Sequence, residues 1–152
     1  MQVRTRITAL MVSLGMVLAG VFGVVSPASA AAGDCANGSL CFWVDSNYSG
    51  ARYNLGAGRN ANLQNNPCGG CRSSTNSGAN GTWNDMASSW YNRTSTPVCV
   101  YANPNYGGST SLRVEPGQAR SFNSTWNDRM TSVRPAIWRS GGGTIVPGYS
   151  CF

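Results

Sequence analysis

The chain has 152 residues, with 11 basic residues, 5 acidic residues and no histidine, for a net charge of +6. The absence of histidine excludes Ser-His-Asp and Cys-His catalysis and histidine-ligated zinc, and because every basic residue is arginine, lysine Schiff-base chemistry is excluded as well. Beyond the amino-terminal segment the arginines are scattered from Arg52 to Arg139, so the basic patch that nucleic-acid binding requires is missing. We therefore expect neither an enzyme nor a nucleic-acid-binding protein.

The amino terminus has the pattern of a secretory signal peptide over residues 1–30. Arg4 and Arg6 precede an apolar run over 7–25, and Ala28-Ser29-Ala30 is a small-residue cleavage site. A membrane anchor is the alternative, because the run could nearly span a bilayer, but the cleavage site and the polar sequence after it favour secretion. Cleavage after Ala30 leaves 122 of the 152 residues, enough for one extracellular domain without membrane attachment, and removing the two arginines lowers the net charge from +6 to +4.

The remainder of the chain is rich in Gly, Ser, Asn and aromatic residues, and it has no sustained apolar stripe of helical period. Short runs with aromatic or β-branched residues alternate with turn signals such as Asn37-Gly38 and Pro116-Gly117. Strands at roughly ten-residue spacing with such turns predict an all-β sandwich or barrel. The expected strands cover 40–44, 51–55, 88–92, 98–102, 110–114 and 132–138.

Two phrases occur twice. The first is an aromatic-x4-aromatic-x-Gly unit, present as Trp43, Tyr48 and Gly50 and again at 101–108; the second is Trp-Asn-Asp, at 83–85 and 126–128. The first unit suits a strand entering a folded hairpin, in which the two aromatic rings pack together and the glycine adopts a positive φ. The repetition predicts two homologous halves.

The two halves differ in length. Trp43 and Trp83 are 40 residues apart, whereas Tyr101 and Trp126 are 25 apart, so the first half carries about fifteen extra residues. We place this insertion within 58–81, a segment rich in Asn, Gly and Ser. The domain is expected to cover 31–140, followed by a Gly-rich tail over 141–152.

All six cysteines lie beyond the signal sequence, and an even number in a short exported chain indicates three disulfides. The spacing favours the pairs Cys35–Cys41 and Cys68–Cys71, which leaves Cys99 to hold the tail through Cys151, although other pairings stay open. A redox pair or half a zinc site at 68–71 is disfavoured, because a second Cys-x-x-Cys and all histidines are absent.

The repeated Asn-Asp-x-x-Ser/Thr-Ser phrase concentrates oxygen atoms. Calcium binds six to eight hard oxygen ligands, so Asp85 and Ser88 could supply one site, and Asp128 and Thr131 another. One carboxylate per loop predicts weak binding, with a dissociation constant of roughly 0.1–1 mM. The alternative is that the phrases only close turns while their tryptophans fill the core, and the residues alone leave both open. A glycosidase-like pair of Asp85 and Asp128 is disfavoured, because a small sandwich offers no evident cleft.

The paired hairpin openings followed by 84–89 and 127–132 resemble microbial βγ-crystallin domains over about residues 40–138. The resemblance implies a disulfide-stabilised double Greek-key sandwich with two calcium sites, each built from both loops. The implied ligands are the side chains of Asp85, Ser88, Asp128 and Thr131, with the carbonyl groups of Met86 and Arg129. The Arg129 side chain would weaken the second site by about 1 kcal/mol.

The segment Cys35-Ala-Asn-Gly-Ser-Leu-Cys41 resembles the start of the actinobacterial metalloproteinase-inhibitor family. This resemblance implies a monomer that inhibits an extracellular metallopeptidase through a disulfide-braced loop in a second Cys-x4-Cys. That second spacing is absent here; the nearest candidates are the Cys68–Cys71 loop and the neighbourhood of Cys99-Val100-Tyr101, so the inhibitory residues are not assigned. The alternative function is a calcium-binding module for cell-surface or extracellular polymers.

Overall fold

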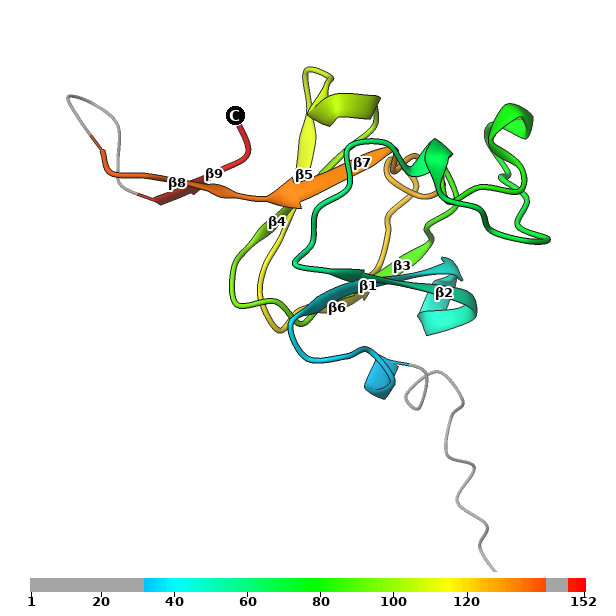
Figure 1. Ribbon diagram of the computed structural model, residues 1–152, viewed down its shortest axis with the longest axis horizontal. Helices are drawn as coiled ribbons and strands as arrows, with labels where there is room; N and C mark the ends of the chain where they lie inside the picture. The colour runs from blue at the N-terminus through cyan, green and yellow to red at the C-terminus, as the bar shows by residue number, and fades with distance from the viewer. Residues whose placement is uncertain (1–31, 142–147) are drawn as a thin grey trace, which may run out of the picture.

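A computed structural model describes residues 32–141 and 148–152, and Figure 1 shows two packed sheets with a hairpin arm at one end. The secretory signal expected over 1–30 lies outside the described residues. Within the described part of the chain, no helix is long and apolar enough to cross a membrane.

The first sheet is formed mainly by the first half of the chain, and its strand order is β2-β1-β3-β6. All of its pairings are antiparallel. The strands are β1 (Ser39–Asp45), β2 (Ser49–Gly56), β3 (Ser89–Asn92) and β6 (Ala119–Ser121). The second sheet has the order β5-β4-β7, with β4 (Val98–Tyr101), β5 (Ser111–Val114) and β7 (Ser132–Pro135).

The two halves exchange chain segments between the sheets. Strand β6 belongs to the second half in sequence but pairs with β3 in the first sheet. In return, Asn60 of the first half forms a single β-bridge to Val133 in β7, with reciprocal backbone hydrogen bonds of 2.8 Å. The insertion that follows Asn60 reduces the reciprocal strand to this one bridge. This exchange confirms the double Greek-key sandwich and brings the segments before β3 and β7 to the same end of the molecule.

Both hairpin openings have the geometry expected from the aromatic spacing. The rings of Trp43 and Tyr48 pack edge to face with centroids 5.4 Å apart, and those of Tyr101 and Tyr106 do the same at 5.9 Å. Short 3-10 turns, η1 (Ser46–Tyr48) and η4 (Pro104–Tyr106), reverse the chain between the aromatic residues. Gly50 has a φ of +74°, and a Cβ there would lie 2.6 Å from the Val44 side chain, so glycine is required.

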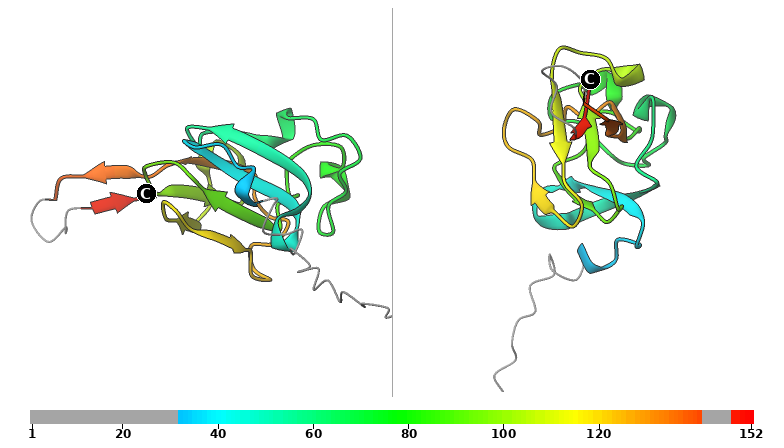
Figure 2. Two further views of the ribbon diagram at one scale, coloured as in Figure 1. Left: turned by 90° about the horizontal axis from the view of Figure 1, so that it is seen from below. Right: turned by 90° about the vertical axis from the view of Figure 1, so that its left-hand side faces the viewer.

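The core lies between the sheets and includes apolar side chains from both. Phe42 in β1 packs edge to face on Trp83, with ring centroids 5.4 Å apart. The 3-10 turns η2 (Leu63–Asn65) and η3 (Ser77–Ala79) of the insertion each bury one residue in the same core, Leu63 and Ala79. The insertion is therefore packed onto the domain, at the end opposite the arm in Figures 1 and 2.

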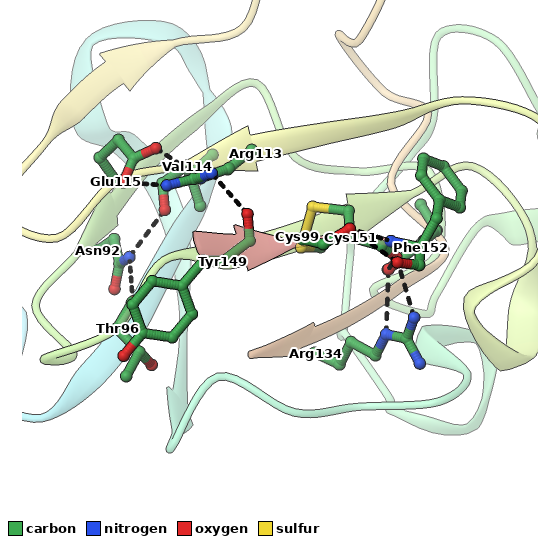
Figure 3. The surroundings of a disulfide bond; sticks show 12 residues. Asn92, Thr96, Cys99, Arg113, Val114, Glu115, Arg134, Tyr149, Cys151 and Phe152 are labelled. Atoms are coloured by element: carbon green, nitrogen blue, oxygen red, sulfur yellow. Dashed lines mark hydrogen bonds and ion pairs between the residues drawn. A yellow bond between two sulfur atoms is a disulfide. The ribbon is translucent and has the colours of Figure 1, made fainter. Parts of the chain in front are cut away.

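The structure contains three disulfides, Cys35–Cys41, Cys68–Cys71 and Cys99–Cys151, which are the pairs favoured by the sequence spacing. Cys99–Cys151 joins β4 to the residue that follows the last strand, β9 (Gly148–Ser150). Figure 3 shows two arginines bracing this junction: Arg134 donates to the Cys151 carbonyl oxygen at 2.9 Å, and Arg113 donates to that of Tyr149 at 2.8 Å.

The carboxyl-terminal region differs from the expected strand and tail. The run predicted as one strand over 132–138 is divided at Ala136 into β7 and β8 (Ile137–Arg139), because β8 leaves the sandwich and pairs with β9 (Gly148–Ser150). This two-stranded arm projects from the domain (Figure 2). Among the described residues, the exposed large hydrophobic side chains are Ile137 and Trp138 on strand β8 of the arm, and Phe152, which follows β9 and packs edge to face on Tyr101.

Candidate functional site

The two Asn-Asp loops, 84–89 and 127–132, lie against each other. The Asp85 N–H donates to the Met130 carbonyl oxygen at 3.0 Å, and the Asp128 N–H donates to that of Ala87 at 3.0 Å. These reciprocal bonds relate the loops by an approximate twofold symmetry. Both aspartates have a φ of 51°, in the left-handed region, which aspartate tolerates better than most residues because its short side chain bonds locally.

The oxygen-bearing side chains pair across the two loops. Ser88 Oγ donates to Asp128 Oδ1 at 3.1 Å, and Thr131 Oγ1 donates to Asp85 Oδ1 at 3.3 Å. The sequence suggested a grouping by loop, Asp85 with Ser88 and Asp128 with Thr131, whereas the hydrogen bonds form two crossed pairs, Asp85 with Thr131 and Asp128 with Ser88. Greek-key packing places each aspartate beside the hydroxyl of the other half. The arrangement from both loops, implied by the crystallin resemblance, matches this geometry.

The final serine of each phrase fixes its loop to a hairpin. Ser89 Oγ donates to the Asp45 carbonyl oxygen at 2.7 Å and accepts from the Tyr48 N–H at 3.0 Å. Ser132 Oγ donates to the Asn103 carbonyl oxygen at 2.6 Å and accepts from the Tyr106 N–H at 3.0 Å. The sequence repeat pointed to these two serines, because both occupy the last position of their phrase. Only the fold identified the residues that they contact.

The insertion contributes three residues that the sequence analysis did not identify. Ser74 donates to Asp128 Oδ2 through its hydroxyl group and, at 3.4 Å, through its N–H. Thr75 Oγ1 donates to the Asp128 carbonyl oxygen at 2.6 Å, and Asn76 Nδ2 donates to Asp85 Oδ2 at 2.9 Å. An Asn/Ser-rich insertion gives no periodic signal for such contacts.

A pocket of about 500 Å³ opens between the loops and the insertion, so the expectation that the sandwich offers no cleft was wrong. The pocket forms because the insertion folds back over the paired loops. Its walls include both carboxylates and the exposed Arg129, whereas the Met86 side chain is buried in the core. The lining residues are Thr75, Asn76, Asp85, Ala102, Asn103, Ser124, Asn127, Asp128 and Arg129.

The atoms that could bind a metal at this pocket are hard oxygen atoms. Each pair of side chains from opposite loops, Asp85 with Thr131 and Asp128 with Ser88, includes one carboxylate. Among the described residues there is no group of three or more His, Cys, Asp or Glu side chains, so a cation would depend on hydroxyl and carbonyl oxygens. Thr131 Oγ1 also donates to the Ala102 carbonyl oxygen at 3.0 Å, so its one proton is shared between this carbonyl and Asp85 Oδ1. Oxygen atoms about 3 Å apart have the separation of neighbouring ligands around calcium, whose bonds are about 2.4 Å long.

One polar atom beside the aspartates lacks a partner. Asn84 is 6% exposed, and its Oδ1 is buried without a hydrogen-bond partner among the described residues. Its Nδ2 donates to Asp85 Oδ2 at 2.9 Å, so the carboxamide lies directly against the carboxylate. A buried acceptor without a donor is unfavourable, and Asn84 itself is not among the residues that line the pocket.

Residues 28–114 match the model of peptidase inhibitor family I36, which covers more than half of the chain. The chain belongs to this family. Membership in peptidase inhibitor family I36 confirms the resemblance stated from Cys35–Cys41. No match was found among curated proteins.

Solved structures place this I36 member among the βγ-crystallin folds. A structure concerned with the evolution of the eye-lens βγ-crystallin domain fold has a TM-score of 0.50 and 19% identity, and covers 68% of this chain and 90% of its own. A βγ-crystallin from Ciona intestinalis has a TM-score of 0.46 and 20% identity, with 64% and 99% covered. A βγ-crystallin domain from Clostridium beijerinckii has a TM-score of 0.45 and 28% identity, with 63% and 94% covered.

Proposed function

We propose that this protein is a secreted inhibitor of extracellular metallopeptidases whose paired loops are stabilised by calcium. The observation that carries the proposal is the match of residues 28–114 to a peptidase inhibitor family. Three disulfides support an extracellular location, because such bonds persist in oxidising compartments. The metallopeptidase class follows from the resemblance at Cys35–Cys41.

The structure narrows the surface that can contact a peptidase. Cys99, Val100 and Tyr101 are each at most 1% exposed, so these three side chains are not a contact loop. By contrast, the Cys68–Cys71 loop exposes Gly69 and Gly70 between two buried half-cystines. A loop held in this way loses little conformational entropy on binding, which favours affinity.

Calcium would be held at the two crossed pairs. One site would use Asp85 with Thr131, and the other Asp128 with Ser88, supplemented by carbonyl oxygens including those of Met86 and Arg129. The ion would neutralise carboxylates that the fold brings together, and its affinity would be weak, with a dissociation constant of roughly 0.1–1 mM.

Inhibition assays test the main proposal. The purified protein is titrated against a thermolysin-like metallopeptidase and against a serine peptidase, with calcium and with chelator. We expect inhibition of the metallopeptidase at micromolar concentration and none of the serine peptidase. Absence of inhibition in both assays would remove the inhibitor proposal.

A second candidate function is supported by the arm. Trp138 is 58% exposed, and its ring is held edge to face by Tyr149 with centroids 5.1 Å apart. Exposed aromatic side chains on a braced hairpin suit a surface that binds cell-wall or other extracellular polymers. Co-sedimentation with insoluble cell-wall polymer would support this module, with or without inhibition.

A further inference from the structure

We propose that residues 74–76 of the insertion, here called the latch, occupy the carboxylates of Asp85 and Asp128 in place of calcium, and that calcium binding displaces them. This inference rests on the proposed calcium sites. The latch donates hydrogen bonds to both aspartates.

Every carboxylate oxygen of the two aspartates accepts a hydrogen bond. On each side chain, Oδ1 accepts from the hydroxyl group of the opposite loop. The other oxygen, Oδ2, accepts from the latch: from Ser74 at Asp128, and from Asn76 at Asp85. The latch thus engages the same atom of both carboxylates, although the insertion occurs in only one half of the chain.

The two kinds of donor respond differently to a cation. A hydroxyl group can rotate and present a lone pair to calcium, so Ser88 and Thr131 can donate without the ion and ligate with it. An N–H group has no such lone pair. The Ser74 N–H is part of the backbone, and Asn76 cannot turn its amide without loss, because its Oδ1 accepts from the Gly78 N–H at 3.1 Å. These N–H groups direct positive charge at oxygens that calcium would use.

The latch is built to move without unfolding the domain. Ser74, Thr75 and Asn76 are exposed. The chain on either side is fixed, by the disulfide at Cys71 and by the fully buried Ala79. A short exposed segment between two fixed points can leave the carboxylates while the core stays packed.

Ser74 of the latch and Ser88 of the opposite loop both donate to the Asp128 carboxylate, so replacing each one tests the proposal. We would measure calcium binding by isothermal titration calorimetry, and thermal unfolding with chelator, for the wild type, Ser74→Ala and Ser88→Ala. Ser74→Ala should raise calcium affinity severalfold, up to about tenfold, and lower the calcium-free Tm, because it removes a competitor that also stabilises the empty site. Ser88→Ala should weaken calcium binding, because it removes a ligand.

Further variants control for nonspecific effects. Ser77→Ala removes an exposed hydroxyl group from the same segment and should leave affinity unchanged. Asn76→Ser keeps an oxygen to cap the Gly78 N–H but removes the amide donor, and it should raise affinity as Ser74→Ala does. Circular dichroism verifies that each variant is folded.

The outcomes separate the latch from the calcium proposal. If the wild type binds calcium and Ser74→Ala binds it equally or more weakly, the latch is refuted and the calcium sites stand. Calcium binding by Ser74→Ala but not by the wild type would support a strong latch. If no variant binds calcium, both ideas are rejected.

Discussion

Ser88 Oγ donates a hydrogen bond to Asp128 Oδ1 at 3.1 Å, although 40 residues separate them in the chain. Thr131 reproduces this contact with Asp85 at 3.3 Å, over 46 residues. Each half of the domain therefore completes the oxygen group of the other. A change in one loop is expected to affect both groups, and this interdependence shapes the predictions that follow.

Replacing Asp85 and Asp128 together by alanine should abolish the calcium-dependent rise in Tm. With about 10 mM calcium and a dissociation constant of roughly 0.1–1 mM, each of the two sites should stabilise the wild type by about 1.5–3 kcal/mol, or some 3–10 °C per site. Differential scanning calorimetry with calcium and with chelator measures the difference. Asp34→Ala is the matched control, because Asp34 is an exposed carboxylate whose ion pair is with Arg52, away from the loops. A rise that survives in the double variant would refute the ligand assignment.

Removing the Cys99–Cys151 disulfide should destabilise the domain more than removing Cys35–Cys41. The first closes a separation of 52 residues and the second of 6, so the chain-entropy model predicts losses of about 4 and about 2 kcal/mol. Urea unfolding of the two double-alanine variants compares them. Equal losses would show that local packing outweighs loop entropy.

Gly50→Ala should destabilise the domain more than Gly117→Ala. Both glycines have a φ of +74°, so both variants incur the same backbone penalty of about 1 kcal/mol. A Cβ at Gly50 would also approach Asp45 and Val44 within 3 Å, whereas one at Gly117 meets nothing within 4 Å. We expect an additional loss of about 1–3 kcal/mol at Gly50, measured by urea unfolding. A matching loss at Gly117 would contradict the steric explanation of the repeated motif.

Trp138→Ala tests the arm. Because this side chain is exposed and packs mainly on Tyr149, its loss should cost about 1 kcal/mol or less, against about 3–5 kcal/mol for the buried Trp43. Polymer co-sedimentation should fall if the arm is a binding surface, while inhibition of a metallopeptidase should stay unchanged. Reduced inhibition with unaffected polymer binding would instead assign the peptidase contact to the arm.

Local sequence pattern was sufficient to predict those elements that depend mainly on residues close together in the chain. The aromatic spacing at Trp43 and Tyr101 predicted both hairpins. Five of the six short runs correspond to single strands, whereas the sixth, 132–138, is divided into β7 and β8. Local pattern was insufficient for β6 and β9, because each has only three residues and lacks a long apolar or alternating run. The break at Ala136 had a local signal in Pro135, the last residue of β7, but only the pairing of β8 with β9 shows that the chain leaves the sandwich there.

The candidate site shows the same division. The repeated phrases identified Asp85, Ser88, Asp128 and Thr131 as oxygen-bearing residues, and the fold grouped them in crossed pairs. Asn76 and Ser74 could not be found in this way, since nothing in an Asn/Ser-rich insertion indicates which of its side chains folds back.

The sequence by itself determined that two homologous β-rich halves, held by three disulfides, each carry an oxygen-rich loop. These properties follow from the spacing of residues along the chain and from the chemistry of their side chains, and both act between residues that are close together in the sequence. Only the tertiary structure decided that Ser88 meets Asp128, that the insertion covers both carboxylates and that Trp138 stands exposed on an arm. Those relationships depend on strand exchange between the halves, in which contacts form between residues far apart in the chain.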